Sequence, residues 1–224
     1  MDPMILLVLA TAAFLATHFV PSTPLRAALV KTVGERPYQG LYSLAAFATI
    51  GWMVYAYLRA PLAPLWDGWR LLPAVAMPFS FILIACGMLS RNPTAVGQEK
   101  LLATAEPARG ILRITRHPVM WGIMLWAGAH VLARGDLKSL IFFGGFLLVA
   151  ALGTQLIDAR KARALGEDWK RYAHATSNVP FVAIVTGRGE LDAAEIGWRN
   201  PAIGLALYAV LFAAHSWLFG ARPF

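Results

Sequence analysis

Three of the five histidines in this sequence lie inside long apolar stretches. They are His18, His130 and His215. Ionisable residues are costly in an apolar segment and often mark a functional site, although a buried histidine can also simply hydrogen-bond to a neighbouring helix. Neutral imidazole is the commonest protein ligand of transition metals. Three such histidines in one small chain therefore favour a metal or cofactor site.

The apolar stretches contain no Asp or Glu that could complete a carboxylate site for zinc or for two irons. Imidazole ligands without carboxylates suit haem, whose iron accepts histidine on one or both axial positions. A covalently attached c-type haem needs Cys-x-x-Cys-His, and Cys86 is the only cysteine. Four aromatic residues precede the histidines at helical spacing and could line a porphyrin, namely Phe14, Trp126, Tyr208 and Phe212. The residues thus favour a haem that is not covalently attached.

Depth in a bilayer gives a test of which histidines could share one iron. At 1.5 Å per residue in a core of about 30 Å, His18 lies about 21 Å from the outer face. His130 lies roughly 12 Å from that face and His215 about 9 Å. A tilted macrocycle could join His18 to His130, whereas His130 and His215 are nearly level. Depth leaves both pairings open.

A fourth histidine, His117, stands at the start of an apolar stretch within Arg116–His117–Pro118. Proline suits the first turn of a helix, so one interpretation is a helix start flanked by cations. The other is a polar site in which Arg116 and His117 bind a haem propionate or a lipid phosphate, because a guanidinium binds such anions through two donors. Both interpretations place these residues at the mouth of a membrane span.

The elements that must position these residues are six apolar stretches. About 20 residues are needed to cross a bilayer, with a range of roughly 17 to 25. Only 14% of residues are charged and 58% are hydrophobic, and no strict alternation suggests a β-barrel. We therefore predict an all-α integral-membrane bundle of about six transmembrane helices, over Met4–Val20, Leu41–Ala60, Leu71–Ser90, Val119–Ala133, Leu140–Ile157 and Pro201–Phe219.

The Lys and Arg residues lie mainly on one side of the predicted membrane. The loops after the first, third and fifth stretches carry 3, 5 and 7 of them, or 15 of 20. The positive-inside rule places these loops in the cytoplasm and both termini outside. Anionic lipids explain the net charge of +8 without a nucleic-acid partner. We expect a multi-pass protein of the bacterial inner membrane, and the sequence leaves room for a homo-oligomer.

The segment after the fifth stretch predicts a cytoplasmic surface helix. Ala162, Leu165, Trp169 and Tyr172 recur at helical spacing among charged residues. Arg116–His117–Pro118 with Gly122, together with Gly166–Glu167 and Tyr172, resembles the membrane methyltransferases that include isoprenylcysteine carboxyl methyltransferase. That resemblance implies that His117 helps to hold the carboxylate of S-adenosylmethionine. Those enzymes carry Glu-Glu where this chain has Ile157–Asp158.

A second resemblance covers nearly the whole chain, and it is to the NnrU family, whose bacterial members are associated with nitrite and nitric oxide metabolism. The matching segments are His18–Arg26, Gly34–Tyr38 with Leu41–Tyr42, Leu65–Trp66, and Arg113–His130. The stretch Asn178–Ile184, Gly187–Arg188 and the last apolar stretch with His215 resemble the isomerase branch of the family. That branch contains haem b enzymes that isomerise ζ-carotene.

The NnrU resemblance implies that His18 and His130 are the haem ligands and the catalytic residues. The branch carries a cysteine three residues before the second ligand, where this chain has Ala127. The implied function is a haem-dependent cis-trans isomerase acting on an apolar polyene in the bilayer. The alternative is a non-catalytic haem protein that senses nitric oxide or relays electrons in denitrification, and a methyltransferase is the third possibility.

The same resemblance sets the expected domain organisation. We predict one membrane domain over residues 1–224. An NnrU-like core covers about 1–157, the surface helix and a link cover about 158–200, and the extra transmembrane helix covers about 201–219.

Overall fold

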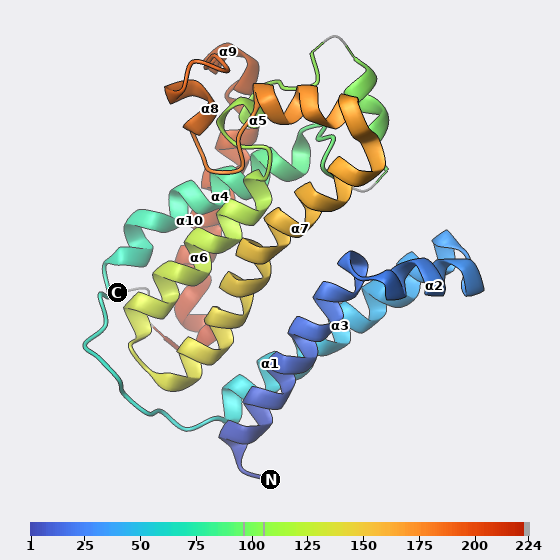
Figure 1. Ribbon diagram of the computed structural model, residues 1–224. Helices are drawn as coiled ribbons and strands as arrows, with labels where there is room; N and C mark the ends of the chain where they lie inside the picture. Colours follow the sequence, from blue (N-terminus) through green and yellow to red (C-terminus); the bar gives the residue numbers. More distant parts are fainter. Residues whose placement is uncertain (96, 105, 222–224) are drawn as a thin grey trace. The chain divides into compact units, whose positions relative to one another are not determined.

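The computed structural model describes residues 1–95, 97–104 and 106–221 of the chain. These residues form helices and connecting segments, and no β-strand occurs among them (Figure 1). The all-α prediction is confirmed.

Six long helices correspond to the six predicted spans. They are α1 Pro3–Phe19, α3 Glu35–Arg59, α4 Leu72–Leu89, α6 Pro118–Arg134, α7 Leu137–Ala175 and α10 Arg199–Phe219. In the described part of the chain, five spans are long and apolar enough to cross a membrane, namely α3, α4, α7, α10 and α1 continued to Ser22. Helix α6 has 17 residues, which is at the lower end of the length that a span needs.

The chain divides into two compact units that share α6 and α7. One unit comprises Met1–Arg70 with Ala127–Val149, and the other comprises Leu71–Trp126 with Ala150–Phe224. We call them the first unit and the second unit. The prediction of a single membrane domain stays a prediction, and each unit is described by itself.

In the first unit, α1 packs along α3 (Figure 1). Two short elements that the hydropathy pattern did not predict connect them, η1 Val20–Ser22 and α2 Pro24–Val33. Helix α3 begins six residues before the predicted Leu41, directly after Gly34, whose φ of 89° ends α2. Pro37 lies in the first turn of α3, where its missing N–H costs nothing. The start is therefore set by turn residues that hydropathy does not register.

In the second unit, α4 packs closely against α10 and against the first half of α6. A Cβ on Gly204 of α10 would fall 2.7 Å from the carbonyl oxygen of Phe81. A Cβ on Gly122 of α6 would fall 2.8 Å from the carbonyl oxygen of Ser80, whose hydroxyl donates to the Gly122 carbonyl at 2.7 Å. Small residues allow such close backbone approach between apolar helices. The two glycines therefore set the helix spacing in this unit.

Helix α7 changes direction at Gly166, whose φ of 54° and ψ of −124° are not helical (Figure 1). Two residues of the predicted surface helix, Ala162 and Leu165, lie before this glycine on the same helix as the predicted fifth span, and only the part with Trp169 and Tyr172 follows the bend. The apolar side of that part is formed by Trp169 and Tyr172, which are 3% and 1% exposed and pack with Leu102 of η2 Glu99–Ala103. The apolar face of this part of α7 therefore packs on the protein, and not on the membrane surface as the sequence pattern predicted. Three single-turn helices complete the unit, α5 Ile111–Ile114, α8 Val182–Val185 and α9 Ala193–Ile196.

Candidate functional site

Arg116 and His117 lie in the extended connection between α5 and α6. Proline disfavours the helical conformation in the residue before it, so Pro118 starts α6 and leaves the two residues outside the helix. Thr115 before them is extended, with φ −154° and ψ 141°. Its hydroxyl donates to the carbonyl oxygen of Asn178 at 2.5 Å. The local sequence thus holds two polar side chains at the mouth of α6.

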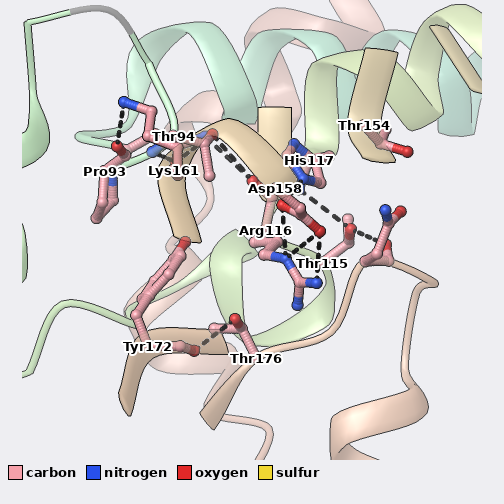
Figure 2. Close-up of polar contacts among 12 residues, drawn as sticks. Pro93, Thr94, Thr115, Arg116, His117, Thr154, Asp158, Lys161, Tyr172 and Thr176 are labelled. Atoms are coloured by element: carbon pink, nitrogen blue, oxygen red, sulfur yellow. Dashed lines mark hydrogen bonds and ion pairs between the residues drawn. The ribbon is translucent and has the colours of Figure 1, made fainter. Parts of the chain in front are cut away.

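Both side chains bind one carboxylate, that of Asp158 on α7 (Figure 2). Arg116 donates from Nε at 3.0 Å and from Nη2 at 2.6 Å to Oδ2, and from Nε at 3.1 Å to Oδ1. His117 Nε2 lies 2.7 Å from Oδ1. An ionised carboxylate only accepts hydrogen bonds, so Nε2 of His117 carries a proton and donates it to this bond. This is a compact Arg–carboxylate–His network.

The network is largely buried. The exposed fractions of the side chains are 2% for His117, 13% for Arg116 and 18% for Asp158. A buried carboxylate is costly unless it is paired and hydrogen-bonded, and here both Arg116 and His117 bind it. The anion that these two side chains bind is therefore the chain's own Asp158 carboxylate. Binding of an additional propionate or phosphate by these residues stays a prediction.

A second buried cation lies close to the network along the same helix. Lys161, three residues after Asp158 on α7, is 5% exposed at its side chain. Its Nζ donates to the carbonyl oxygen of Pro93 at 3.3 Å (Figure 2). It also donates to Glu99 at 2.6 Å. Tyr172 is also buried, and its hydroxyl has no hydrogen-bond partner among the described residues. Buried unpaired hydroxyls are uncommon.

Glu195 on α9 ties the loop before α5 in place. It accepts from Arg113 Nε at 2.7 Å and Nη2 at 3.1 Å, from Gly110 N at 2.9 Å and from Arg109 Nε at 3.3 Å. These bonds, that from Arg113 first, lower the pKa of Glu195 to about 2. Gly110 has φ 58°, and its backbone lies close to that of Glu195: a Cβ added to Gly110 would fall 3.1 Å from the Glu195 carbonyl oxygen. We call these bonds to Glu195 the Glu195 latch. They fix the position of the segment that leads through α5 to Arg116.

His18 and His130 belong to the first unit, His18 on α1 and His130 on α6. The Nδ1 of His18 lies 2.9 Å from the carbonyl oxygen of Phe14. The His130 ring stacks on Phe143 with centroids 4.9 Å apart and an angle of 28°. Both imidazoles are half-buried.

A continuous series of ring contacts connects the two histidines within this unit. Successive centroids are 4.2, 4.8, 5.4, 5.0 and 4.9 Å apart along His18, Phe14, Phe146, Phe142, Phe143 and His130. Aromatic pairs at such separations are favourable beyond their buried area. The structure therefore associates the two histidines with one aromatic cluster, which we call the ring series.

His215 belongs to the second unit, on α10. Its Nδ1 lies 2.8 Å from the carbonyl oxygen of Ala221, and its ring is 4.9 Å from that of Phe219. Within the described residues, no three His, Cys, Asp or Glu side chains gather as a metal site. Pairing of His130 with His215 stays a prediction.

The donors in the first unit fit the chemistry of an axial haem ligand. A ligating histidine usually bonds its second nitrogen to a carbonyl or carboxylate, which fixes the ring and the tautomer. His18 has such a bond through Nδ1, and Nε2 then carries the lone pair. No carboxylate lies on the ring series. His18 therefore has the second-nitrogen bond that an axial haem ligand usually makes, and haem binding by His18 and His130 stays a prediction.

The sequence did not indicate that Asp158 is the partner of Arg116 and His117. It drew attention to Asp158 only as a departure from a Glu-Glu pair. The signal that could have found it is its position at the end of an apolar helix, where an unpaired carboxylate is costly. The burial of Tyr172 was equally unforeseen, since a helical pattern does not tell whether an apolar face meets lipid or protein.

Comparisons with known proteins give two similar relatives, both named 15-cis-zeta-carotene isomerase, chloroplastic. The chain is 39% identical over 79 residues to that of Arabidopsis thaliana, covering 35% of this chain and 22% of the relative. It is 33% identical over 100 residues to that of Zea mays, covering 44% of this chain and 27% of the relative. The matches thus span about a quarter of each relative's length.

No solved structure matches the chain significantly. A family model described as "NnrU protein" matches residues 6–223, which is almost the entire sequence and includes both the ring series and the Arg116–His117–Asp158 network. The chain belongs to the NnrU family.

Proposed function

We propose that the protein is an integral-membrane, haem-dependent isomerase that converts cis to trans double bonds in a carotenoid-type polyene. The observation that carries the proposal is the similarity of 33% and 39% to two isomerases of this type. Helices long and apolar enough to cross a membrane suit a substrate that dissolves in the bilayer. An apolar polyene has no group that needs a charged partner, so the aromatic first unit is the better candidate for its site.

His18 and His130 would hold the haem b. When bound, the haem supplies a redox-active iron that lowers the barrier to rotation about a conjugated double bond. The protein's contribution is ligation and access. The Nδ1–H of His18 would keep donating to the carbonyl oxygen of Phe14 at the observed 2.9 Å. Its Nε2 would then be the nitrogen that binds the iron. Phe143 would hold the His130 ring by stacking.

The surroundings of the second ligand favour histidine over thiolate. Ala127 lies one turn before His130 and is fully buried at 0% exposed. Cys86 is the only cysteine of the chain, so no thiol stands at this position. The buried aromatic residues Phe14 and Phe142, at 1% and 8% exposed, keep water away from this part of the first unit.

The first test is an absorption spectrum of the purified protein, oxidised and reduced, after expression with added haem. We expect a six-coordinate low-spin b-type spectrum from the native chain. His130→Ala and His18→Ala should each lose most of the haem or leave it five-coordinate, because each removes an axial ligand. His174→Ala is the matched control, since His174 is exposed beyond Gly166, and it should retain the native spectrum.

The rival ligand is tested in the same series. Loss of the low-spin spectrum in His215→Ala with retention in His18→Ala would refute the pairing of His18 with His130. Chromatography of a cis-polyene incubated with the reduced protein in vesicles tests catalysis. Haem binding without isomerisation would favour the non-catalytic haem protein, and absence of haem in every preparation would refute the proposed function.

A further inference from the structure

The segment around α8 displays apolar side chains outward. Val179 is 51% exposed, Phe181 49%, Val182 39% and Val185 83%. Four neighbouring apolar side chains of this kind form a patch rather than the scattered single residues that any surface carries. We call these four residues the α8 patch.

The α8 patch is held rigidly by backbone contacts to the start of α6. The carbonyl oxygen of Asn178 accepts from Thr115 Oγ1 at 2.5 Å and from Trp121 Nε1 at 2.8 Å. The N–H of Phe181 donates to the carbonyl oxygen of Ile114 at 2.8 Å. Phe181 has φ 67°, the only non-glycine residue with positive φ in the described chain. Such a conformation persists only where the surroundings enforce it, so the patch has a fixed orientation.

The same contacts give the depth of the patch. Trp121 is three residues after the first residue of α6, which is about 4.5 Å along the helix axis at 1.5 Å per residue. Its indole N–H reaches Asn178, the residue before the patch begins. Ile114, on the other side of Pro118, contacts Phe181. The patch therefore lies level with the first turn of α6, where that helix would enter the membrane.

A second marker of the membrane boundary lies at the same end of the unit. Trp198 is 75% exposed directly before α10, and the Arg199 guanidinium lies 6.0 Å from its ring centre. Exposed tryptophan at the end of an apolar helix is typical of the layer between headgroups and acyl chains. Glu195, three residues before Trp198, bonds to Gly110 N immediately before α5, and α5 contacts α8.

We propose that the α8 patch inserts into the headgroup–acyl boundary of the bilayer and anchors the Arg116–His117–Asp158 network at that level. The occupant is lipid, because the patch lies level with the entry of α6 and apolar side chains there lose contact with water when lipid covers them. The inference rests on the membrane placement in the proposed function but not on haem or on catalysis.

The test uses Val185→Cys in the full-length chain, labelled with an environment-sensitive fluorophore. Val185 is the most exposed residue of the patch, and the native Cys86 is buried, so the native chain serves as the labelling blank. The protein is reconstituted into phosphatidylcholine–phosphatidylglycerol vesicles that carry spin labels on the headgroup or midway along the acyl chain. Ala194→Cys, on exposed α9, is the matched control.

We expect the label at residue 185 to emit at shorter wavelength than that at 194. Lipid spin labels should quench it and aqueous iodide should quench it weakly, with the opposite pattern at 194. Iodide quenching of 185 equal to that of 194 would overturn the proposal. So would protection from both quenchers, which would mean that protein covers the patch, or failure of the protein to float with the vesicles. A haem spectrum of the same sample shows independently whether the isomerase proposal holds.

Discussion

The two regions with candidate chemistry differ in what surrounds their histidines. His18 and His130 stand at the ends of a series of aromatic rings, and no acidic side chain takes part. His117 is buried against a carboxylate that an arginine also binds. A ring contact adds about 0.5–1.5 kcal/mol beyond its buried area, whereas removing one partner of a buried ion pair costs about 3–5 kcal/mol. We therefore expect the network to contribute more to stability than a single contact of the ring series.

The largest effect should come from Asp158→Ala, which leaves the buried Arg116 and His117 without their carboxylate. Removing one partner of a buried pair costs about 3 kcal/mol, and the thermal midpoint of the purified protein should fall accordingly. Asp168→Ala is the control, because Asp168 and its partner Arg171 are 57% and 69% exposed and such surface pairs contribute little. Equal midpoints for the two variants would contradict the assigned importance of the network.

An intermediate effect is expected from Phe14→Leu in the ring series. The substitution keeps apolar bulk at a position 1% exposed but removes the ring contacts with His18 and Phe146. Aromatic pairs contribute about 0.5–1.5 kcal/mol each, and with both pairs in the lower half of that range unfolding in detergent should show a loss of about 1–2 kcal/mol. Phe47→Leu, 74% exposed on α3, should leave stability unchanged. A loss as large as that in Asp158→Ala would erase the contrast between the regions.

The smallest effect concerns pH and the Glu195 latch. The bond from Arg113, followed by those from Gly110 and Arg109, lowers the pKa of Glu195 from 4.5 to about 2. A lowered carboxyl pKa adds stability above its unfolded value, and that stability is lost as the pH falls from about 4.5 towards 2. The midpoint difference between pH 6 and pH 3 should therefore be smaller in Glu195→Gln than in the native chain. An identical difference in both proteins would show that the latch contributes nothing.

Hydropathy predicted the bounds of the helices well where contact with lipid or with a neighbouring helix determines them. The bounds of α1, α4, α6 and α10 lie within two residues of those expected, because long charge-free stretches have one compatible secondary structure in a bilayer. It failed at the start of α3 and at the end of α7, and it missed α2. The start of α3 follows the turn at Gly34, and α7 continues past the predicted Ile157, bends at Gly166 and ends at Ala175. Mean hydropathy does not record these backbone conformations.

The candidate residues themselves were identifiable from the sequence, since histidine in an apolar segment is costly enough to be informative. Their environments were not. The sequence separates Asp158 from Arg116 by 42 positions, and only the packing of α7 beside the start of α6 brings the carboxylate to the guanidinium. Likewise, the spacing of Trp169 and Tyr172 predicts a helix with one apolar face, but only tertiary contact with Leu102 decides that this face meets protein. The spacing of apolar residues is encoded within one helix. The residue that packs against an apolar face, or that pairs with a charge, comes from a second element and is decided by how the two elements pack.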